Sequence, residues 1–148
     1  MYSPVSGLFL YWVAKTFTLA KRERLKSRKS IEKLFSAGRH FFIYPFKVYF
    51  TFSSSVEEPP VLKAGVAVSA RNFKKAVDRN RVKRLTREAY RLQKEELQQK
   101  LAARQKSLEL FFVYVGKEIP VFAQLHEKLR LILERLIQKA DEDNTQNT

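Results

Sequence analysis

The chain has 148 residues, 45% of them hydrophobic, so its length and composition indicate one domain with a real core rather than a disordered basic tail. Lys and Arg number 29 against 15 acidic residues, and the formal net charge of +14 favours a polyanionic partner. Nucleic acid is the leading candidate and an anionic membrane surface the lesser one. The absence of cysteine excludes disulfides, a thiolate nucleophile and a cysteine-based zinc site.

The first residues contain one apolar segment, GLFLYWVA at residues 7–14. A bilayer-spanning helix needs about 20 residues, and no basic residue precedes the segment as in a signal peptide. We therefore expect residues 1–20 to form a poorly ordered extension and no membrane segment. A single domain is predicted over residues 21–139, followed by a frayed polar tail over residues 140–148.

The first predicted helix covers residues 30–38, SIEKLFSAG. Ser27 or Ser30 can cap its start, and Gly38 stands where a left-handed C-terminal cap would fall. One apolar stripe, expected to face the core, runs along this helix: Ile31, Leu34 and Phe35.

Two or three strands are predicted next, and the pattern is clearest in FKVYFTF at residues 46–52. Its strict alternation is typical of a strand with one buried and one wet face. Residues 53–60 have the composition of a loop. The strand predicted over residues 61–69 contains small residues, so we expect another group to approach it closely. The wet face of the first strand carries Lys47, Tyr49 and Thr51.

The second half of the chain predicts a helix, a strand and a helix. A basic helix starts between residues 75 and 78 and holds its pattern to about Leu92. Residues 95–104 are polar, which leaves open a continuation of that helix or a separate turn. Residues 108–115 are apolar on both faces, as in an interior strand covered on each side. An amphipathic helix follows over residues 121–139, with its inward positions at Phe122, Leu125, Leu129, Ile132 and Leu136.

The predicted order is therefore αβββαβα, which indicates an α+β fold. We expect a single-layer, mostly antiparallel sheet of about four strands with three helices packed on it.

The basic helix is two-sided. At about 100° per residue, an arc of about 80° holds its apolar stripe, which we take as Val82, Leu85, Ala89 and Leu92. Residues 71–91 contain nine basic and two acidic residues, 9 − 2 = +7, half of the formal net charge. A merely solvated face would interleave Glu and Lys, and here only Asp78 and Glu88 do so. Arg dominates over Lys, which suits bidentate phosphate contacts. RNA is favoured over the DNA major groove, because neither leucine heptads nor a helix-turn-helix partner accompanies the helix.

Residues 73–90, FKKAVDRNRVKRLTREAY, follow a GVAVS strand at residues 65–69. Together they resemble the RNR motif of the bacterial ribonuclease P protein subunit. Residues 24–26 (RLK) and 31–35 (IEKLF) resemble the opening helix of that family, and the resemblance covers roughly residues 21–139. It implies a fold like the second domain of a small-subunit ribosomal protein. The βαβ crossover through the basic helix would be left-handed, against the usual rule.

The resemblance also implies a function in the bacterial cytoplasm. The chain would bind one ribonuclease P RNA, which is the catalyst, and precursor tRNA, whose single-stranded 5′ leader is removed in a Mg²⁺-dependent cleavage. The RNA would hold the Mg²⁺, and we expect no catalytic or metal-binding residue in the chain and no obligate protein partner. The implied RNA-binding residues are Arg71, Asn72, Lys74, Lys75, Arg79, Asn80, Arg81, Lys83, Arg84, Arg87 and Arg91. The implied leader-binding cleft comprises Ile31, Phe35, Lys47 and Tyr49.

A second function stays open on the residues alone: a structural RNA-binding protein, ribosomal or chaperone-like, with no enzymatic role. Lys47 and Tyr49 on one wet strand face favour the subunit, since single-stranded RNA is held by stacking and backbone charge. Phe35 is more simply explained as a core residue. His40, in a predicted loop, and His126 are far apart in sequence, and no acid pair has metal-ligand spacing. The sequence therefore does not predict a chain that cuts RNA by itself.

Overall fold

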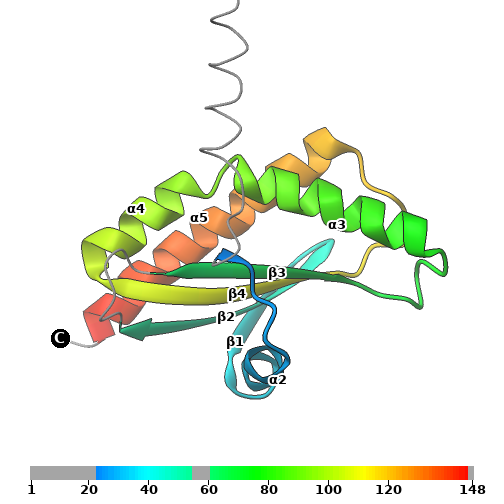
Figure 1. The fold of residues 1–148 in the computed structure, drawn as a ribbon. Helices are drawn as coiled ribbons and strands as arrows, with labels where there is room; N and C mark the ends of the chain where they lie inside the picture. The colour runs from blue at the N-terminus through cyan, green and yellow to red at the C-terminus, as the bar shows by residue number, and fades with distance from the viewer. Residues whose placement is uncertain (1–22, 55–60, 147–148) are drawn as a thin grey trace, which may run out of the picture.

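The computed structural model describes residues 23–54 and 61–146, so the predicted extension at residues 1–20 and most of the predicted loop lie outside it. One sheet carries helices on both faces (Figure 1). No helix in the described ranges has an apolar stretch long enough to cross a membrane. One face is covered by α2 (Arg28–Ala37), the other by α3 (Ala76–Arg91), α4 (Glu95–Arg104) and α5 (Phe122–Gln146).

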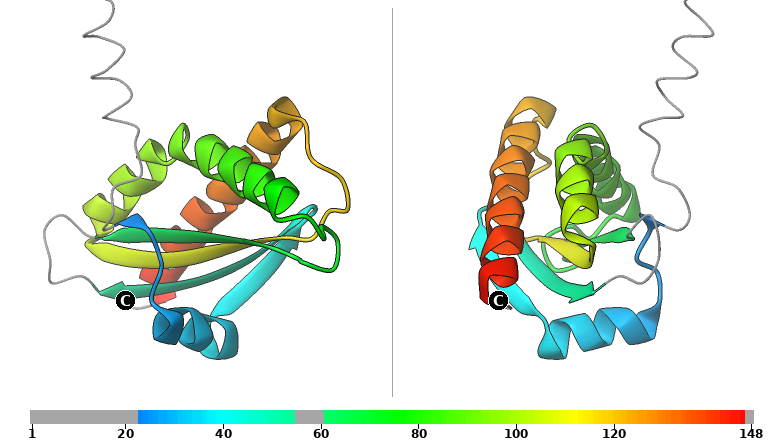
Figure 2. Two further views of the ribbon diagram at one scale, coloured as in Figure 1. Left: turned by 45° about the vertical axis from the view of Figure 1, so that its right-hand side comes forward. Right: turned by 90° about the vertical axis from the view of Figure 1, so that its left-hand side faces the viewer.

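The sheet has four strands in the order β1-β2-β4-β3. β1 pairs with β2 and β2 with β4 in antiparallel fashion, whereas β3 and β4 are parallel, which confirms a mostly antiparallel α+β sheet. Seen along β3 with the helices above the sheet, β4 lies to the left of β3 (Figure 2, right), so the β3–β4 crossover is left-handed. The strands are β1 (Arg39–Ile43), β2 (Phe46–Ser54), β3 (Leu62–Val68) and β4 (Lys106–Tyr114).

The core forms on both faces of the central strand β4. Phe112 is fully buried under α3 and α5, and Phe111 is buried on the opposite face against α2. The prediction of an interior strand covered on each side is thus confirmed. The alternation in β2 is confirmed as well, since Phe46, Val48 and Phe50 point into the larger cluster.

The buried side of α3 differs from the predicted stripe. Thr86 and Tyr90 are fully buried beside the expected Val82 and Ala89, whereas Leu92 is 41% exposed. Thr86 can face the core because its hydroxyl donates to the Val82 carbonyl oxygen, 2.8 Å away. Leu92 leaves the stripe because α3 ends at Arg91 and the chain then turns toward α4.

Four helices are present in the described ranges, where the sequence predicted three. α4 is a separate helix because Leu97 and Leu101 are buried, and it ends at Gln105, whose φ of 54° is left-handed. α5 continues to Gln146, so the tail predicted from residue 140 begins too early. Ala140 is fully buried, and Asp141 forms ion pairs with Lys100 and Arg104 of α4, which holds this turn in place.

At the ends of α2 one expectation is confirmed and one is wrong. The Ser27 hydroxyl oxygen accepts from the Ser30 backbone N–H at 3.3 Å, as an N-cap should. Gly38 is extended (φ −76°, ψ 159°) and not left-handed. Glycine is needed there for space, because a Cβ atom would lie 2.5 Å from the Leu34 carbonyl oxygen.

Residues 23–27 cross the edge of β3 on their way from the helical face to α2. Glu23 forms a partly buried ion pair with Lys94, with 2.6 Å between Oε2 and Nζ, and accepts from Gln98. Arg24 then forms a parallel bridge with Ala64 of β3. Burial, and secondarily Glu23, raise the pKa of the Tyr90 phenol below this segment.

The small residue Gly65 permits this crossing, which confirms that another group approaches the strand. A Cβ atom on residue 65 would lie 2.6 Å from Cε2 of Phe111 and 3.1 Å from the Leu25 carbonyl oxygen. We expect Gly65→Ala to lower the free energy of unfolding by about 1–3 kcal/mol, because the Phe111 ring must move. Urea denaturation of the purified protein measures the change.

The control for this prediction is the same substitution in a Phe111→Leu background. Removing the ring removes the clash, so Gly65→Ala should cost less there than in the parent protein. Equal costs in the two backgrounds would contradict the assigned contact.

Candidate RNA-binding surfaces

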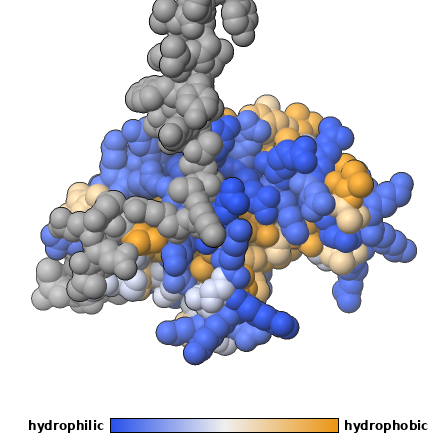
Figure 3. Space-filling view, in the orientation of Figure 1, coloured by the Kyte–Doolittle hydropathy of each residue, from blue (hydrophilic) through white to orange (hydrophobic). Residues whose placement is uncertain are grey.

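The solvent side of α3 carries cations that no carboxylate within residues 23–54 and 61–146 neutralises. Arg81, Arg84 and Arg87 are exposed and Lys83 is half-buried. None of these four side chains forms a hydrogen bond or ion pair with any residue in the described ranges. Figure 3 shows hydrophilic side chains over most of α3 and α4 on this side of the molecule. We call Arg81, Lys83, Arg84 and Arg87 the basic face.

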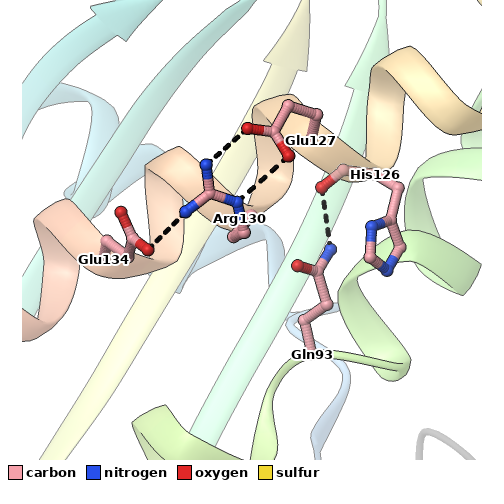
Figure 4. Close-up of polar contacts among 5 residues, drawn as sticks. All are labelled: Gln93, His126, Glu127, Arg130 and Glu134. Atoms are coloured by element: carbon pink, nitrogen blue, oxygen red, sulfur yellow. Dashed lines mark hydrogen bonds and ion pairs between the residues drawn. The ribbon is translucent and has the colours of Figure 1, made fainter.

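The contrast with α5 shows that this arrangement is specific to α3. On α5 the Arg130 guanidinium donates to Glu127 and to Glu134, the latter at 2.6 Å (Figure 4). The hydrogen bond from Arg130 lowers the pKa of Glu127, and Glu127 in turn raises the pKa of Arg130. On α3, Arg91 alone among the predicted RNA-binding arginines has a carboxylate partner in the described ranges, Glu88 at 3.1 Å. The exposed arginine of α5 is therefore neutralised by carboxylates of its own helix, whereas the cations of the basic face on α3 are not.

Two of the predicted RNA-binding residues also form hydrogen bonds within the protein. The Arg79 guanidinium donates to the carbonyl oxygens of Phe73 and Lys74, at 2.7 and 3.0 Å. The Asn72 amide donates to the carbonyl oxygens of Val115 and Gly116, at 3.1 and 3.4 Å. Both side chains therefore position the turn that precedes α3.

That turn leaves its other cations in solvent. Arg71, Lys74 and Lys75 are exposed, and among the described residues no side chain caps the N-terminus of α3. The free N–H groups of a helix N-terminus favour phosphate. The first turn of α3 also exposes Val77, at 77%, which the sequence analysis did not select. An apolar residue outside the core-facing stripe of a helix indicates an exposed apolar contact, and this signal was present in the sequence. Val77 lines a shallow hollow together with Asn80, Arg81 and Arg84.

The residues predicted for the leader-binding cleft come together on the opposite face of the sheet, beside α2. The Phe35 ring lies edge-on to Tyr49, with 4.7 Å between ring centres. The Lys47 ammonium lies 5.2 Å from the centre of the Tyr49 ring, and Ile31 packs against the small cluster around Leu34. We call Ile31, Phe35, Lys47 and Tyr49 the aromatic face. Phe35 is 43% exposed, so its explanation as a core residue is wrong.

Two further residues lie beside the aromatic face, and the sequence did not predict their positions there. His40 lies in β1 and not in a loop, and it pairs with Tyr49 across the strands, with ring centres 5.6 Å apart. Phe111 lies edge-on to Phe35 at 5.2 Å. The β1–β2 register that places His40 follows from the turn at residues 44–45, which the sequence alone did not resolve.

The described ranges contain no group of three or more His, Asp or Glu side chains that could hold a metal ion. His126 lies half-buried on α5, and its carbonyl oxygen accepts from Gln93 at 2.9 Å (Figure 4).

The chain is similar to known proteins over most of its length. The family model described as Ribonuclease P matches residues 19–137. The ribonuclease P protein component of Porphyromonas gingivalis is 38% identical over 121 residues, which cover 82% of this chain and 88% of that protein. That of Chlorobaculum tepidum is 30% identical over 131 residues, covering 83% and 85%.

Solved structures that resemble this chain are also RNase P proteins. The RNase P protein from Thermotoga maritima superposes with a TM-score of 0.58 at 26% identity, over 77% of this chain and 97% of that one. The Staphylococcus aureus RNase P protein gives a TM-score of 0.61 at 20% identity, over 78% and 96%, and shows a similar fold. The match to the family model and the identity with these relatives together show that the chain belongs to the ribonuclease P protein component family.

Proposed function

We propose that the chain is the protein subunit of a bacterial cytoplasmic ribonuclease P, binding one catalytic RNA and the single-stranded 5′ leader of precursor tRNA. The observation that carries this proposal is the presence of two unlike surfaces on opposite faces of one sheet. The basic face of α3 has no counterion in the part of the chain that the structure describes, and the aromatic face beside α2 exposes rings next to a lysine. Family membership supports the role as subunit.

The basic face suits a folded RNA. Arg81, Lys83, Arg84 and Arg87 project from a helix whose other side is locked into the core, so their spacing does not depend on the RNA. Each phosphate that such a cation contacts releases condensed counterions, which gives affinity that falls with salt. Arg79 and Asn72 contribute indirectly in this proposal, by fixing the turn that presents Arg71, Lys74 and Lys75.

The aromatic face suits a single strand. Phe35 and Tyr49 offer ring surface for unstacked bases, and Lys47 beside Tyr49 offers a charge for the backbone. A structural RNA-binding protein would need no such surface. The catalytic Mg²⁺ would be bound by RNA phosphate oxygens, which are the hard ligands that this ion prefers. The part played by the chain is then to neutralise phosphates and to orient the leader, with no side chain acting as acid or base.

Reconstitution tests the proposal directly. The purified protein is mixed with a bacterial ribonuclease P RNA and a precursor tRNA at physiological Mg²⁺, and mature 5′ ends are mapped. We expect faster leader removal than with the RNA alone. Equal rates with and without the protein would overturn the proposal.

Removing single cations from the basic face should weaken RNA binding in a salt-dependent way. For Arg84→Ala or Arg87→Ala, we expect the slope of log K against log salt to fall by about one unit each, because one phosphate contact is lost. Filter binding of the catalytic RNA over a salt series measures the slope.

Arg130→Ala on α5 is the matched control, since it removes the same charge from a side chain already paired with Glu127 and Glu134. Its slope should equal that of the parent protein. Direct phosphate contact by α3 is contradicted if Arg84→Ala behaves like Arg130→Ala.

Removing the ring of Tyr49 should affect the leader more than the catalytic RNA. A stacked base contributes about 1–3 kcal/mol, so Tyr49→Ala should weaken binding of leader-bearing precursor roughly tenfold and leave RNA-subunit affinity nearly unchanged. Tyr49→Phe keeps the ring and should stay close to the parent. Equal losses of both affinities in Tyr49→Ala would mean that the aromatic face is not the leader site.

A further inference from the structure

A pocket lies at one end of the molecule, between the β1–β2 turn, the loop after β4 and the start of α5. Its volume is about 620 Å³. Pro45, Tyr114 and Leu125 give it apolar walls, and Tyr44, 60% exposed, stands at its side. The lining also includes the cations Lys117 and Lys128 and the carboxylate of Glu118, so the lining carries a net positive charge.

The loop that forms one side of this pocket is held in place before any ligand arrives. The Tyr114 hydroxyl donates to the Glu118 carbonyl oxygen at 2.7 Å, and the Val115 N–H donates to the Pro45 carbonyl oxygen at 2.8 Å. Lys117 and Lys128 form no ion pair with any residue in the described ranges. The pocket is therefore a pre-formed, largely apolar hollow beside two ammonium groups that have no direct ion-pair partner among the described residues.

A row of exposed rings joins the aromatic face to this pocket. His40 and Phe42 of β1 are paired with Tyr49 and Lys47 of β2, so all four side chains share one face of the sheet. Phe42 is 55% exposed, and its ring centre lies 6.3 Å from that of Tyr44. Burying such rings is favourable, so a run of exposed ones marks a binding surface.

The other side of the pocket is tied to the turn before α3. The Asn72 amide donates to the carbonyl oxygens of Val115 and Gly116, and the Phe73 ring lies 6.1 Å from that of Tyr114. The pocket thus sits between the aromatic face and the turn that carries Arg71, Lys74 and Lys75.

We propose that this pocket binds a nucleotide of the 5′ leader after the strand has left the aromatic face. The base would stack on Tyr44, the ribose would lie over Pro45 and Tyr114, and Lys117 and Lys128 would neutralise the adjoining phosphates. This inference rests on the function proposed above. The pocket continues from the aromatic face and is positively charged, and both features favour the leader strand as its occupant. Proteins bind single strands with aromatic rings that stack on the bases and cations that contact the phosphates.

A series of precursor tRNAs with leaders shortened one nucleotide at a time tests the proposal. Substrate affinity is measured with holoenzyme reconstituted from the catalytic RNA and each protein variant. We expect Tyr44→Ala to match the parent on the shortest leaders and to bind about tenfold more weakly once the leader is long enough to reach the pocket. Tyr49→Ala should already lose affinity at shorter leaders.

Two controls separate stacking from charge. Tyr44→Phe keeps the ring and should bind like the parent at every leader length. Lys117→Gln should lower the salt slope for long leaders by about 0.7, as expected for a single-strand phosphate contact. Lys139→Gln removes the same charge near the end of α5, where Lys139 lies over the Phe50 ring, and should leave that slope unchanged.

The outcomes distinguish this inference from the function on which it rests. A leader-length effect of Tyr49→Ala without one for Tyr44→Ala overturns the pocket alone. A Tyr44→Ala loss that is equal at all leader lengths also overturns it, because the pocket would then contact another RNA segment. The absence of any leader-length effect in both variants overturns the leader-binding function itself.

Discussion

Charge repulsion on α3 is the constraint on which the rest of the structure depends. Like charges one turn apart destabilise a helix by a few tenths of a kcal/mol each, whereas a fully buried apolar side chain contributes about 1.5–3 kcal/mol. Val82, Ala89 and Tyr90 are buried, so packing against the sheet and α5 outweighs the repulsion. The cations are therefore held at fixed spacing before any partner is present, which would reduce the entropy lost in the RNA binding proposed above.

Periodicity predicted the elements whose environment is local. The alternation of β2, the two-sided burial of β4 and the inward stripe of α5 all appear in the structure. The predictions that were wrong concerned elements that depend on contacts between distant parts of the chain. α4 forms a helix because Leu97 and Leu101 pack into the core, and α5 continues past residue 140 because Asp141 pairs with α4. The left-handed crossover was available only from the family resemblance, since no propensity encodes it.

The sequence predicted which residue types form the candidate surfaces, but it predicted less well what each side chain contacts. A basic run indicates phosphate binding, but it cannot reveal that Arg79 and Asn72 bond to carbonyl oxygens of their own chain. Phe35 could equally have been core, and only the position of α2 at the sheet shows its ring exposed beside Tyr49. The contact of His40 with Tyr49 could not be predicted, because strand register is set by the folded chain, whereas Val77 was overlooked although it lies outside the apolar stripe of α3.

The crossing of residues 23–27 over β3 has a consequence for the protein before assembly. An outermost strand with free N–H and carbonyl groups is a template for pairing with another molecule. The Arg24–Ala64 bridge and the hydrogen bond from the Leu25 N–H to the Ala64 carbonyl oxygen occupy part of the free edge of β3. The Glu23–Lys94 ion pair holds this covering segment in place. A newly made copy awaiting its RNA is thereby shielded on this side from edge-to-edge aggregation.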